Sequence, residues 1–354
     1  MDKRENLLRL LRRQGYEFAP VEFALCEKLE NDYRKFEKTD EDYRDYFQMD
    51  WRNAPPLMPD NTDLSRFLPY HGGSLDTWTT LDEWGVGHRK TPSSMHMSQM
   101  LFPLKDADSV EQIQSYPMPT YTSQGNPHLR EEVEALHRRG LASMGNMQCT
   151  VWETSWYMRG MENLMMDMMS EDEMAQCLLD RVTQISLDKA LLYARAGVDM
   201  LFLGDDIGMQ RTLLMSRELY RTWIQPRLKK IISAVKAERP EILILYHSCG
   251  YIQPIIPDLI DAGIDVLNPV QPECMDFEEI HREFGDVLSF TGTIGTQTVM
   301  PFGTSEEVRE TVWKNLRIAG PKGGLLACPT HLLEPEVPWE NIRAYVEACR
   351  SFQG

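Results

Sequence analysis

Short apolar runs alternate with amphipathic helical segments along most of this 354-residue chain, and this alternation limits the folds open to it. After residue 140, six runs have the length and composition of buried strands. They are residues 141–153, 198–208, 241–250, 264–271, 286–295 and 323–330. Runs that are apolar on both faces and separated by helices are typical of a parallel sheet that is covered on both sides.

The helical segments between these runs are expected at 128–140, 159–195, 216–240, 255–263, 276–285 and 305–320, with a last one from 338. Two earlier runs, PVEFAL at 20–25 and DYFQMDW at 45–51, bring the expected strands to eight. We therefore predict an α/β fold, a (β/α)8 TIM barrel that forms one domain over 1–354. The alternative is an open doubly wound sheet, but no G-x-G-x-x-G motif follows the first strand.

Residues 52–130 differ from the rest because they show no clear periodicity and are rich in Pro, Gly, Ser and Thr. A segment of this length without regular structure usually packs on a larger domain, often beside its site. We expect an irregular N-terminal elaboration that lies near the mouth of the barrel.

Charge and composition exclude several classes of partner. The formal net charge is -17, so a nucleic acid or an anionic membrane surface would be repelled. No apolar stretch approaches the roughly 20 residues that span a bilayer, and the charged, amphipathic N-terminal segment lacks the features of a signal peptide. We therefore expect a cytoplasmic protein. Its 7 cysteines are then free thiols or metal ligands rather than disulfides.

Polar residues follow the predicted strands at the end where a barrel carries its catalytic groups. Polar groups at buried strand ends cost free energy unless they are paired, so we expect these residues to surround a site. In chain order they are Glu153, Asp205, Asp206, His247, Cys249, Asn268, Gln271, Thr291, Thr293, Cys328 and His331.

One imidazole and two thiols among these residues suggest a metal site. His247 and Cys249 are two residues apart, so an extended strand places both side chains on one face. Cys328 would reach the same point from another strand end. A histidine with two cysteines matches a catalytic zinc site that keeps one position open. The alternative is that both cysteines are small buried hydrophobic residues and that His247 is a hydrogen-bonded core residue.

The acids and aromatic residues nearby complete the predicted site. One of Asp205 and Asp206 could cap a helix, and the other could orient substrate, serve as a fourth metal ligand or hold a histidine. Glu153 could form a structural salt bridge or contact the metal or substrate. We predict these three acids as catalytic. Substrate contacts are expected from Trp152, Trp156, Tyr157, Asn268, Gln271 and His331.

Three strings of the sequence resemble the uroporphyrinogen decarboxylase superfamily. They are YHSCGYIQPIIPDLIDAGIDVLNPVQPECMD, FTGTIGTQTVMPFGTSEEVRE and CPTHLLEPEVPWENI, which begin at residues 246, 290 and 328. The resemblance is clear from about residue 140 to the end and looser before it. Members of that superfamily fold as (β/α)8 barrels, so the resemblance implies the same fold.

The resemblance favours one branch of the superfamily. The decarboxylases carry an N-terminal Arg-Gln-Ala-Gly-Arg-Tyr segment, whereas residues 12–23 here read RRQGYEFAPVEF. The zinc- and cobalamin-linked methyltransferases carry His-x-Cys and a distant Cys, which correspond to His247, Cys249 and Cys328. This resemblance implies Zn²⁺, a cobalamin (corrinoid) carried by a partner corrinoid protein, a small-molecule methyl donor, and a homodimer as often as a monomer.

Four functions follow as hypotheses. The first is O-demethylation, in which zinc activates a methyl ether, with a methoxylated aromatic as the leading example, and cob(I)alamin accepts the methyl group. The second is methyl transfer from methylcobalamin to a thiol such as coenzyme M. The third is a metal-free decarboxylase in which His331 and an aspartate exchange protons. The fourth is a zinc-stabilised binding protein, which three ligands argue against because structural zinc sites are normally closed.

Overall fold

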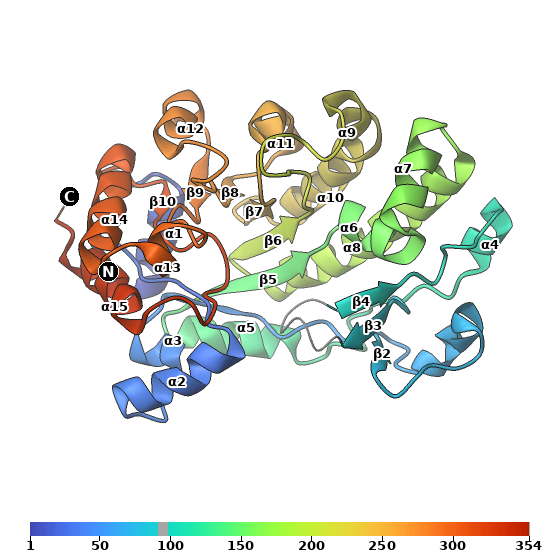
Figure 1. The fold of residues 1–354 in the computed structure, drawn as a ribbon, viewed down its shortest axis with the longest axis horizontal. Coiled ribbons are helices and arrows are strands. Elements are labelled where there is room, and N and C mark those ends of the chain that lie inside the picture. Colours follow the sequence, from blue (N-terminus) through green and yellow to red (C-terminus); the bar gives the residue numbers. More distant parts are fainter. Residues whose placement is uncertain (91–97, 354) are drawn as a thin grey trace.

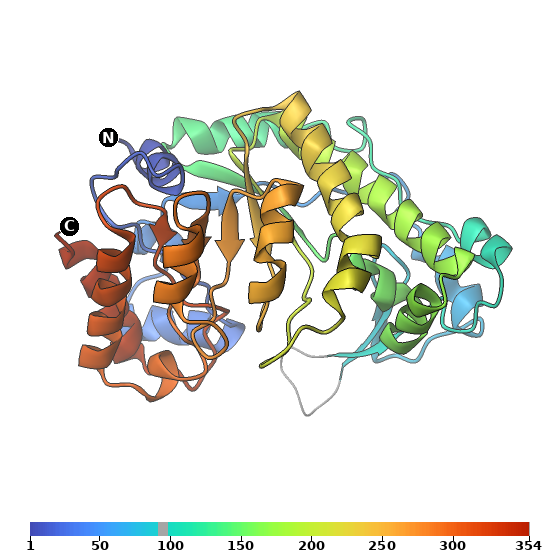
Figure 2. The same ribbon diagram turned by 90° about the horizontal axis from the view of Figure 1, so that it is seen from above.

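A computed structural model describes residues 1–90 and 98–353 of the chain. Within these residues the main sheet has seven strands in the order β1-β5-β6-β7-β8-β9-β10, and all neighbouring strands are parallel. Their bounds are β1 Trp51–Asn53, β5 Ala142–Gln148, β6 Met200–Gly204, β7 Leu243–His247, β8 Val266–Asn268, β9 Ser289–Thr291 and β10 Leu325–Leu326. The curled sheet, with helices on its outer side, confirms the predicted α/β barrel class (Figures 1 and 2).

Helices follow the strands as the alternation predicted. Those after β5 are α6 (Trp152–Arg159), α7 (Met161–Met169), α8 (Glu173–Ala196), α9 (Arg217–Trp223), α10 (Gln225–Glu238), α11 (Ile256–Ala262), α12 (Phe277–Phe284), α13 (Val299–Phe302), α14 (Ser305–Ala319) and α15 (Trp339–Ser351), with a 3-10 turn η2 at Gln253–Ile255. Helix α8 contacts β5 and β6 and buries an apolar stripe, in which Leu178, Leu179 and Val182 are fully buried.

The two early strands of the prediction were wrong in detail. Residues 20–25 form no strand, and one parallel bridge joins Leu25 to Leu333. Within 45–51, helix α3 (Tyr43–Tyr46) takes the first part and β1 begins only at Trp51. The helical spacing of the buried Tyr43 and Phe47 explains this, since residues four apart share a helix face. Residues 20–25 take the eighth position in the wall of the barrel, where a strand was expected, and we call this irregular segment the eighth stave.

The predicted run 141–153 is also too long, because β5 ends at Gln148 and α6 begins at Trp152. The turn between them contains Cys149 with φ 63, a left-handed conformation. The buried carboxylate of Asp205, after β6, accepts hydrogen bonds from the backbone N–H groups of Val151 and Glu153. This tertiary contact starts the helix, and Glu153 therefore lies on α6 rather than at a strand end.

The N-terminal helix α1 (Lys3–Leu11) covers one end of the barrel interior. Its Leu7, Leu8, Leu10 and Leu11 are buried together with Ala142, Met144, Met200, Leu243, Leu245, Val266, Leu326 and Cys328. These partners belong to most of the strands, so α1 packs against the inside of the sheet rather than its outer surface. The barrel therefore has an apolar floor below its strand ends.

Leu10→Ala is expected to lower the free energy of unfolding by about 3 kcal/mol, since Leu10 is fully buried in this floor and truncation leaves a cavity. Urea denaturation would measure the change. Glu5→Ala on the exposed side of the same helix is the control and should change stability by less than about 0.5 kcal/mol. Equal losses in both variants would contradict the position of Leu10.

Residues 52–130 contain more regular structure than predicted. In the described chain they form a three-stranded antiparallel sheet of β2 (Thr79–Leu81), β3 (Gly87–Lys90) and β4 (Ser98–Leu101), a 3-10 helix η1 (Leu64–His71) and helix α4 (Val110–Ser115); residues 91–97 lie outside the described residues. Helix α5 (Leu129–Arg138) leads back to β5, while α2 (Glu27–Glu37) follows the eighth stave. The small sheet lies at the end of the molecule opposite both termini (Figure 1).

The elaboration is tied to the barrel through α6. The N–H of Leu104 donates to the carbonyl of Met158, and the buried Arg159 donates to the carbonyls of Leu104, Lys105 and Ala107. Arg159 also pairs with Asp167 at 2.8 Å. No helix in the described part of the chain is both long and apolar enough to cross a membrane.

Candidate functional site

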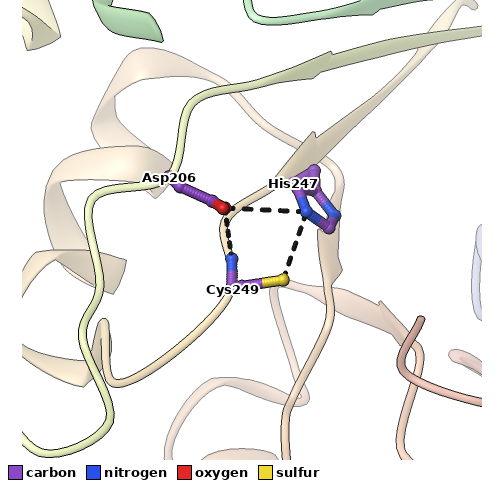
Figure 3. A group of neighbouring side chains, drawn as sticks. All are labelled: Asp206, His247 and Cys249. Atoms are coloured by element: carbon purple, nitrogen blue, oxygen red, sulfur yellow. Dashed lines mark hydrogen bonds and ion pairs between the residues drawn. The ribbon is translucent and has the colours of Figure 1, made fainter. Parts of the chain in front are cut away.

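Three polar side chains meet where β6 and β7 end. Asp206 follows β6, His247 is the last residue of β7, and Cys249 lies two residues further on (Figure 3). Cys249 Sγ lies 3.4 Å from His247 Nε2, and Asp206 Oδ1 lies 3.6 Å from the same nitrogen. The N–H of Cys249 donates to Asp206 Oδ1 at 2.7 Å. Among the described residues, these three bring one ligand atom each within 4.8 Å of the others.

The His247 ring is oriented for binding at Nε2. Its Nδ1 lies 2.6 Å from Asn268 Oδ1, an acceptor at the end of β8, so Nδ1 carries the proton and Nε2 keeps its lone pair. Burial lowers the pKa of His247, which favours the neutral imidazole that a metal requires. A ligand histidine held by a second residue in this way is a common arrangement in metal sites.

Asn268→Ala is expected to weaken metal binding about 10- to 100-fold, because His247 loses the acceptor that sets its tautomer and orientation. Competition with a chromophoric chelator would measure the affinity. Asn268→Asp keeps an oxygen acceptor and is the matched control, expected to remain near wild type. Unchanged affinity in Asn268→Ala would show that the hydrogen bond does not orient His247 for binding.

The other two predicted acids adjoin the cluster. Asp205 is 1% exposed and its carboxylate accepts backbone N–H groups at the start of α6, with burial raising its pKa well above the usual range. Glu153 Oε2 accepts the N–H of Asp206 at 3.1 Å, and Glu153 Oε1 accepts the Tyr157 hydroxyl at 2.8 Å. Burial, followed by the charge of Asp206, raises the pKa of Glu153.

The electrostatics of the cluster suit a bound cation. Among the described residues, no lysine or arginine forms an ion pair with Glu153, Asp205 or Asp206; the ion pair of Asp206 is with His247. Burial, and then the charge of Asp206, raises the pKa of Cys249 to about 12. A divalent cation would balance the negative charge of these carboxylates, which have no lysine or arginine partner in the described chain, and it would lower the pKa of the Cys249 thiol. The donor set of one imidazole, one thiol and one carboxylate is acceptable to zinc.

The structure does not bring Cys328, the predicted third ligand, into this cluster. Its Sγ lies 3.1 Å from the hydroxyl oxygen of Thr291, a residue at the end of β9. Burial raises the pKa of the Cys328 thiol to about 12. Cys328 nevertheless lines the same cavity as His247. Its role as a ligand stays a prediction, while Asp206 occupies the third position of the observed group.

Two hollows adjoin the cluster. The inner one, of about 300 Å³, lies inside the barrel and is lined largely by apolar and aromatic side chains, with His247, Asn268 and Cys328 on its wall. The outer one, of about 480 Å³, is lined by Cys249, Gln271 and residues of the loops after β6 and β9. Both share Thr330, His331 and Leu332. The cluster thus lies between the inner and the outer hollow, with His247 lining the first and Cys249 the second.

The predicted substrate residues are distributed unevenly. Asn268 lines the inner cavity, Gln271 lines the outer one, where its side chain accepts the N–H of Gly250, and His331 lines both. Trp152 is fully buried in the core. Trp156 and Tyr157 pack edge to face, with ring centroids 4.2 Å apart, on α6. Substrate contact by these three aromatic residues stays a prediction.

Three residues that were not predicted as site residues also line the inner cavity, namely Glu22, Phe23 and Trp51. Glu22 and Phe23 belong to the eighth stave, and Trp51 starts β1. A signal was present for Glu22, since an acid interrupts the otherwise apolar run PVEFAL.

Comparison with known proteins places the chain in a family. A family model described as uroporphyrinogen decarboxylase (URO-D) matches residues 99–352. A methylated-thiol–coenzyme M methyltransferase of Methanosarcina mazei is 27% identical over 203 residues, which cover 55% of this chain and 49% of that protein. The methylcobamide:CoM methyltransferase MtaA of Methanosarcina barkeri is 27% identical over 176 residues, 48% of each chain.

A solved structure, described as a methyltransferase from Methanosarcina mazei, has the same fold with a TM-score of 0.65 at 15% identity, covering 98% of both chains. The chain spans about half the length of the curated relatives it matches. The match of the family model extends over more than half of the chain and includes every residue of the metal-ligand cluster. The protein is therefore a member of the uroporphyrinogen decarboxylase family.

Proposed function

We propose that this chain is a zinc-dependent methyltransferase that moves a methyl group from a methyl ether, with a methoxylated aromatic as the leading example, to the cob(I)alamin of a corrinoid protein. The observation that carries the proposal is the position of the His247, Cys249 and Asp206 cluster at the edge of an apolar, aromatic-lined cavity. The names of both methyltransferase relatives support methyl transfer, and the name of MtaA mentions a methylcobamide.

Zinc would be held by His247 and Cys249, with either the predicted ligand Cys328 or the neighbouring Asp206 as the third ligand, and one position would stay open for the ether oxygen. When bound, it supplies Lewis acidity toward the oxygen that leaves. In the balanced reaction the methyl–oxygen bond breaks, the methyl carbon bonds to cobalt, the two electrons come from cob(I)alamin, and the alkoxide or phenolate departs.

The protein's own residues would orient the reactants. Asn268 holds His247, and the backbone N–H of Cys249 holds the Asp206 carboxylate. Glu153 accepts the backbone N–H of Asp206, so it fixes the loop that carries this acid. In this proposal the inner cavity receives the methyl donor, and the outer hollow beside Cys249 faces the corrinoid protein.

The test is spectroscopic. Incubation of the protein with cob(I)alamin and a methoxyarene should produce the absorption of methylcobalamin, together with one equivalent of the phenol. Protein treated with a chelator and the His247→Ala variant are the controls, and both should be inactive. Failure to form methylcobalamin from any of a panel of methyl ethers would refute the proposal.

A second candidate is transfer of a methyl group from methylcobalamin to a thiol, which the names of both relatives favour because each mentions coenzyme M. It uses the same ligands. Loss of methylcobalamin that depends on added thiol, in the absence of any ether, would support this direction, and a proton should be released when the thiol binds.

A further inference from the structure

Glu22 is an acid on the wall of the inner cavity that the proposed methyl transfer does not use. Most of the other lining residues are apolar or aromatic, Phe23, Trp51 and Phe202 among them, and the polar ones include Gln148 and Asn268. Among the described residues that line it, none is a lysine or an arginine. The ionisable side chains that a ligand would meet from the protein are therefore one carboxyl group, the thiol of Cys328 and two histidines, His247 and His331.

The topology places Glu22 across the cavity from His247. In the described strand order, β7 is the fourth of seven strands, while residues 20–25 form the stave that touches the chain beyond β10 through Leu25 and Leu333. In a barrel, the fourth and eighth staves face each other across the interior. A ligand whose methyl group reaches the His247 side would therefore present its opposite end to Glu22.

Glu22 is held firmly by its backbone. Its N–H donates to the hydroxyl oxygen of Tyr345 at 3.0 Å, and that oxygen lies 2.9 Å from the carbonyls of both Glu22 and Ala327. Tyr345 itself is fully buried. The neighbouring Phe23 packs against Phe47, with ring centroids 5.3 Å apart. The backbone that carries the Glu22 side chain is thus anchored in the fold.

The environment favours the uncharged form of this carboxyl group near neutral pH. Its removal from bulk water raises the pKa of Glu22 to about 8, and the charges of Arg44 and Arg52 only partly oppose this effect. A protonated carboxyl group in an apolar cavity is a hydrogen-bond donor as well as an acceptor. A buried polar group of this kind costs free energy without a partner, so its presence favours a role in binding.

We propose that Glu22 sets the charge class of the substrate, so that the cavity accepts an uncharged, single-ring methyl ether with a hydroxyl group opposite the methoxy group and rejects ring carboxylates and sulfonates. This inference rests on the proposed function, since it names the substrate class of the same site. The cavity volume of about 300 Å³ is at the lower limit for small-molecule sites and suits one ring. At the Glu22 end of the cavity, away from the proposed zinc, an anion would be desolvated without a lysine or arginine among the described lining residues to pair with it, and it would lie beside Glu22.

The experiment is a calorimetric titration of the wild-type protein, without corrinoid, using two probes of the same shape. They are 4-methoxyphenol and 4-methoxybenzoate, which carry a hydroxyl group or a carboxylate opposite the methoxy group. We expect the phenol to bind at least about tenfold more tightly than the benzoate. Equal affinities, tighter binding of the benzoate, or no binding of the phenol at millimolar concentration would overturn the inference.

Variants assign the effect to Glu22. Glu22→Leu removes the hydrogen bond and should weaken 4-methoxyphenol binding about fivefold to tenfold, while Glu22→Gln keeps a donor and an acceptor and should stay within about threefold of wild type. Glu27→Gln, an exposed acid on α2, is the matched control and should leave both affinities unchanged. Circular dichroism would establish that each variant is folded, and unchanged phenol affinity in folded Glu22→Leu would contradict the role of Glu22.

The binding data also separate this inference from the proposed function. If the probes bind with the expected selectivity but no ether yields methylcobalamin, the methyl transfer proposal fails, while the inferred preference of the cavity for uncharged ligands is retained. If both probes are demethylated with equal kcat/KM, the methyl transfer stands and the role of Glu22 is wrong.

Discussion

His247→Ala and Cys249→Ala are each expected to purify without metal and without methyl transfer activity, whereas the wild-type protein should contain about one zinc per chain. Four-ligand zinc sites are worth about 10–16 kcal/mol, so a single ligand carries on the order of 3 kcal/mol, or more than a hundredfold in affinity. Inductively coupled plasma mass spectrometry would measure the metal. Cys177→Ala, a half-buried cysteine on α8, is the control and should retain full occupancy.

The same measurement decides which residue completes the site. The resemblance implies Cys328, whereas the structure gathers Asp206 with His247 and Cys249. Loss of zinc in Cys328→Ala would show that its thiol leaves Thr291 when the metal binds. Loss in Asp206→Asn with retention in Cys328→Ala would instead assign the carboxylate. A folded wild-type protein that binds no zinc would remove the metal from the proposed function altogether.

Asp205→Ala is expected to lower the free energy of unfolding by about 3 kcal/mol. The substitution leaves the buried N–H groups of Val151 and Glu153 without their acceptor, and an unpaired buried donor costs about 1–3 kcal/mol. Because these groups start α6, the position of Glu153 against Asp206 should also be disturbed, and methyl transfer should fall even where the protein remains folded.

Chemical denaturation would give the stability of this variant, and single-turnover formation of methylcobalamin would give its activity. Asp205→Asn retains one acceptor oxygen and serves as the control, with a smaller loss in both measurements. If Asp205→Ala were as stable as the wild type, the start of α6 would not depend on this carboxylate. If it were stable but inactive, Asp205 would take part in the chemistry directly, as the sequence analysis predicted.

Much of the barrel could be predicted because its signals are local. The apolar runs that became β6 to β10 and the helices between them are read from composition and periodicity over a few residues. The predictions failed where a distant contact overrides that local pattern. Residues 149–153 are apolar enough for a strand, but Asp205 turns them into the start of a helix.

Some residues of the candidate site could likewise be predicted from local spacing, and others could not. The spacing of His247 and Cys249 on one strand end was enough to predict that they act together, and the structure places their side-chain atoms 3.4 Å apart. No spacing relates Asp206 to them, because it lies on a different strand and reaches the cluster only through the pairing of β6 with β7. Glu22 was missed for a similar reason, since its cavity exists only once the barrel has closed.

The sequence by itself therefore determined the class of fold, the strand end that carries His247 and Cys249, and the family resemblance. The tertiary structure decided which acid joins them, the separation of Cys328 from the cluster, and the presence of the Glu22 carboxyl group on the wall of the same cavity as His247. The physical reason is that hydrophobic periodicity depends on neighbours along the chain. Ligand geometry and cavity charge depend instead on contacts between residues tens or hundreds of positions apart, which form only when the sheet curls.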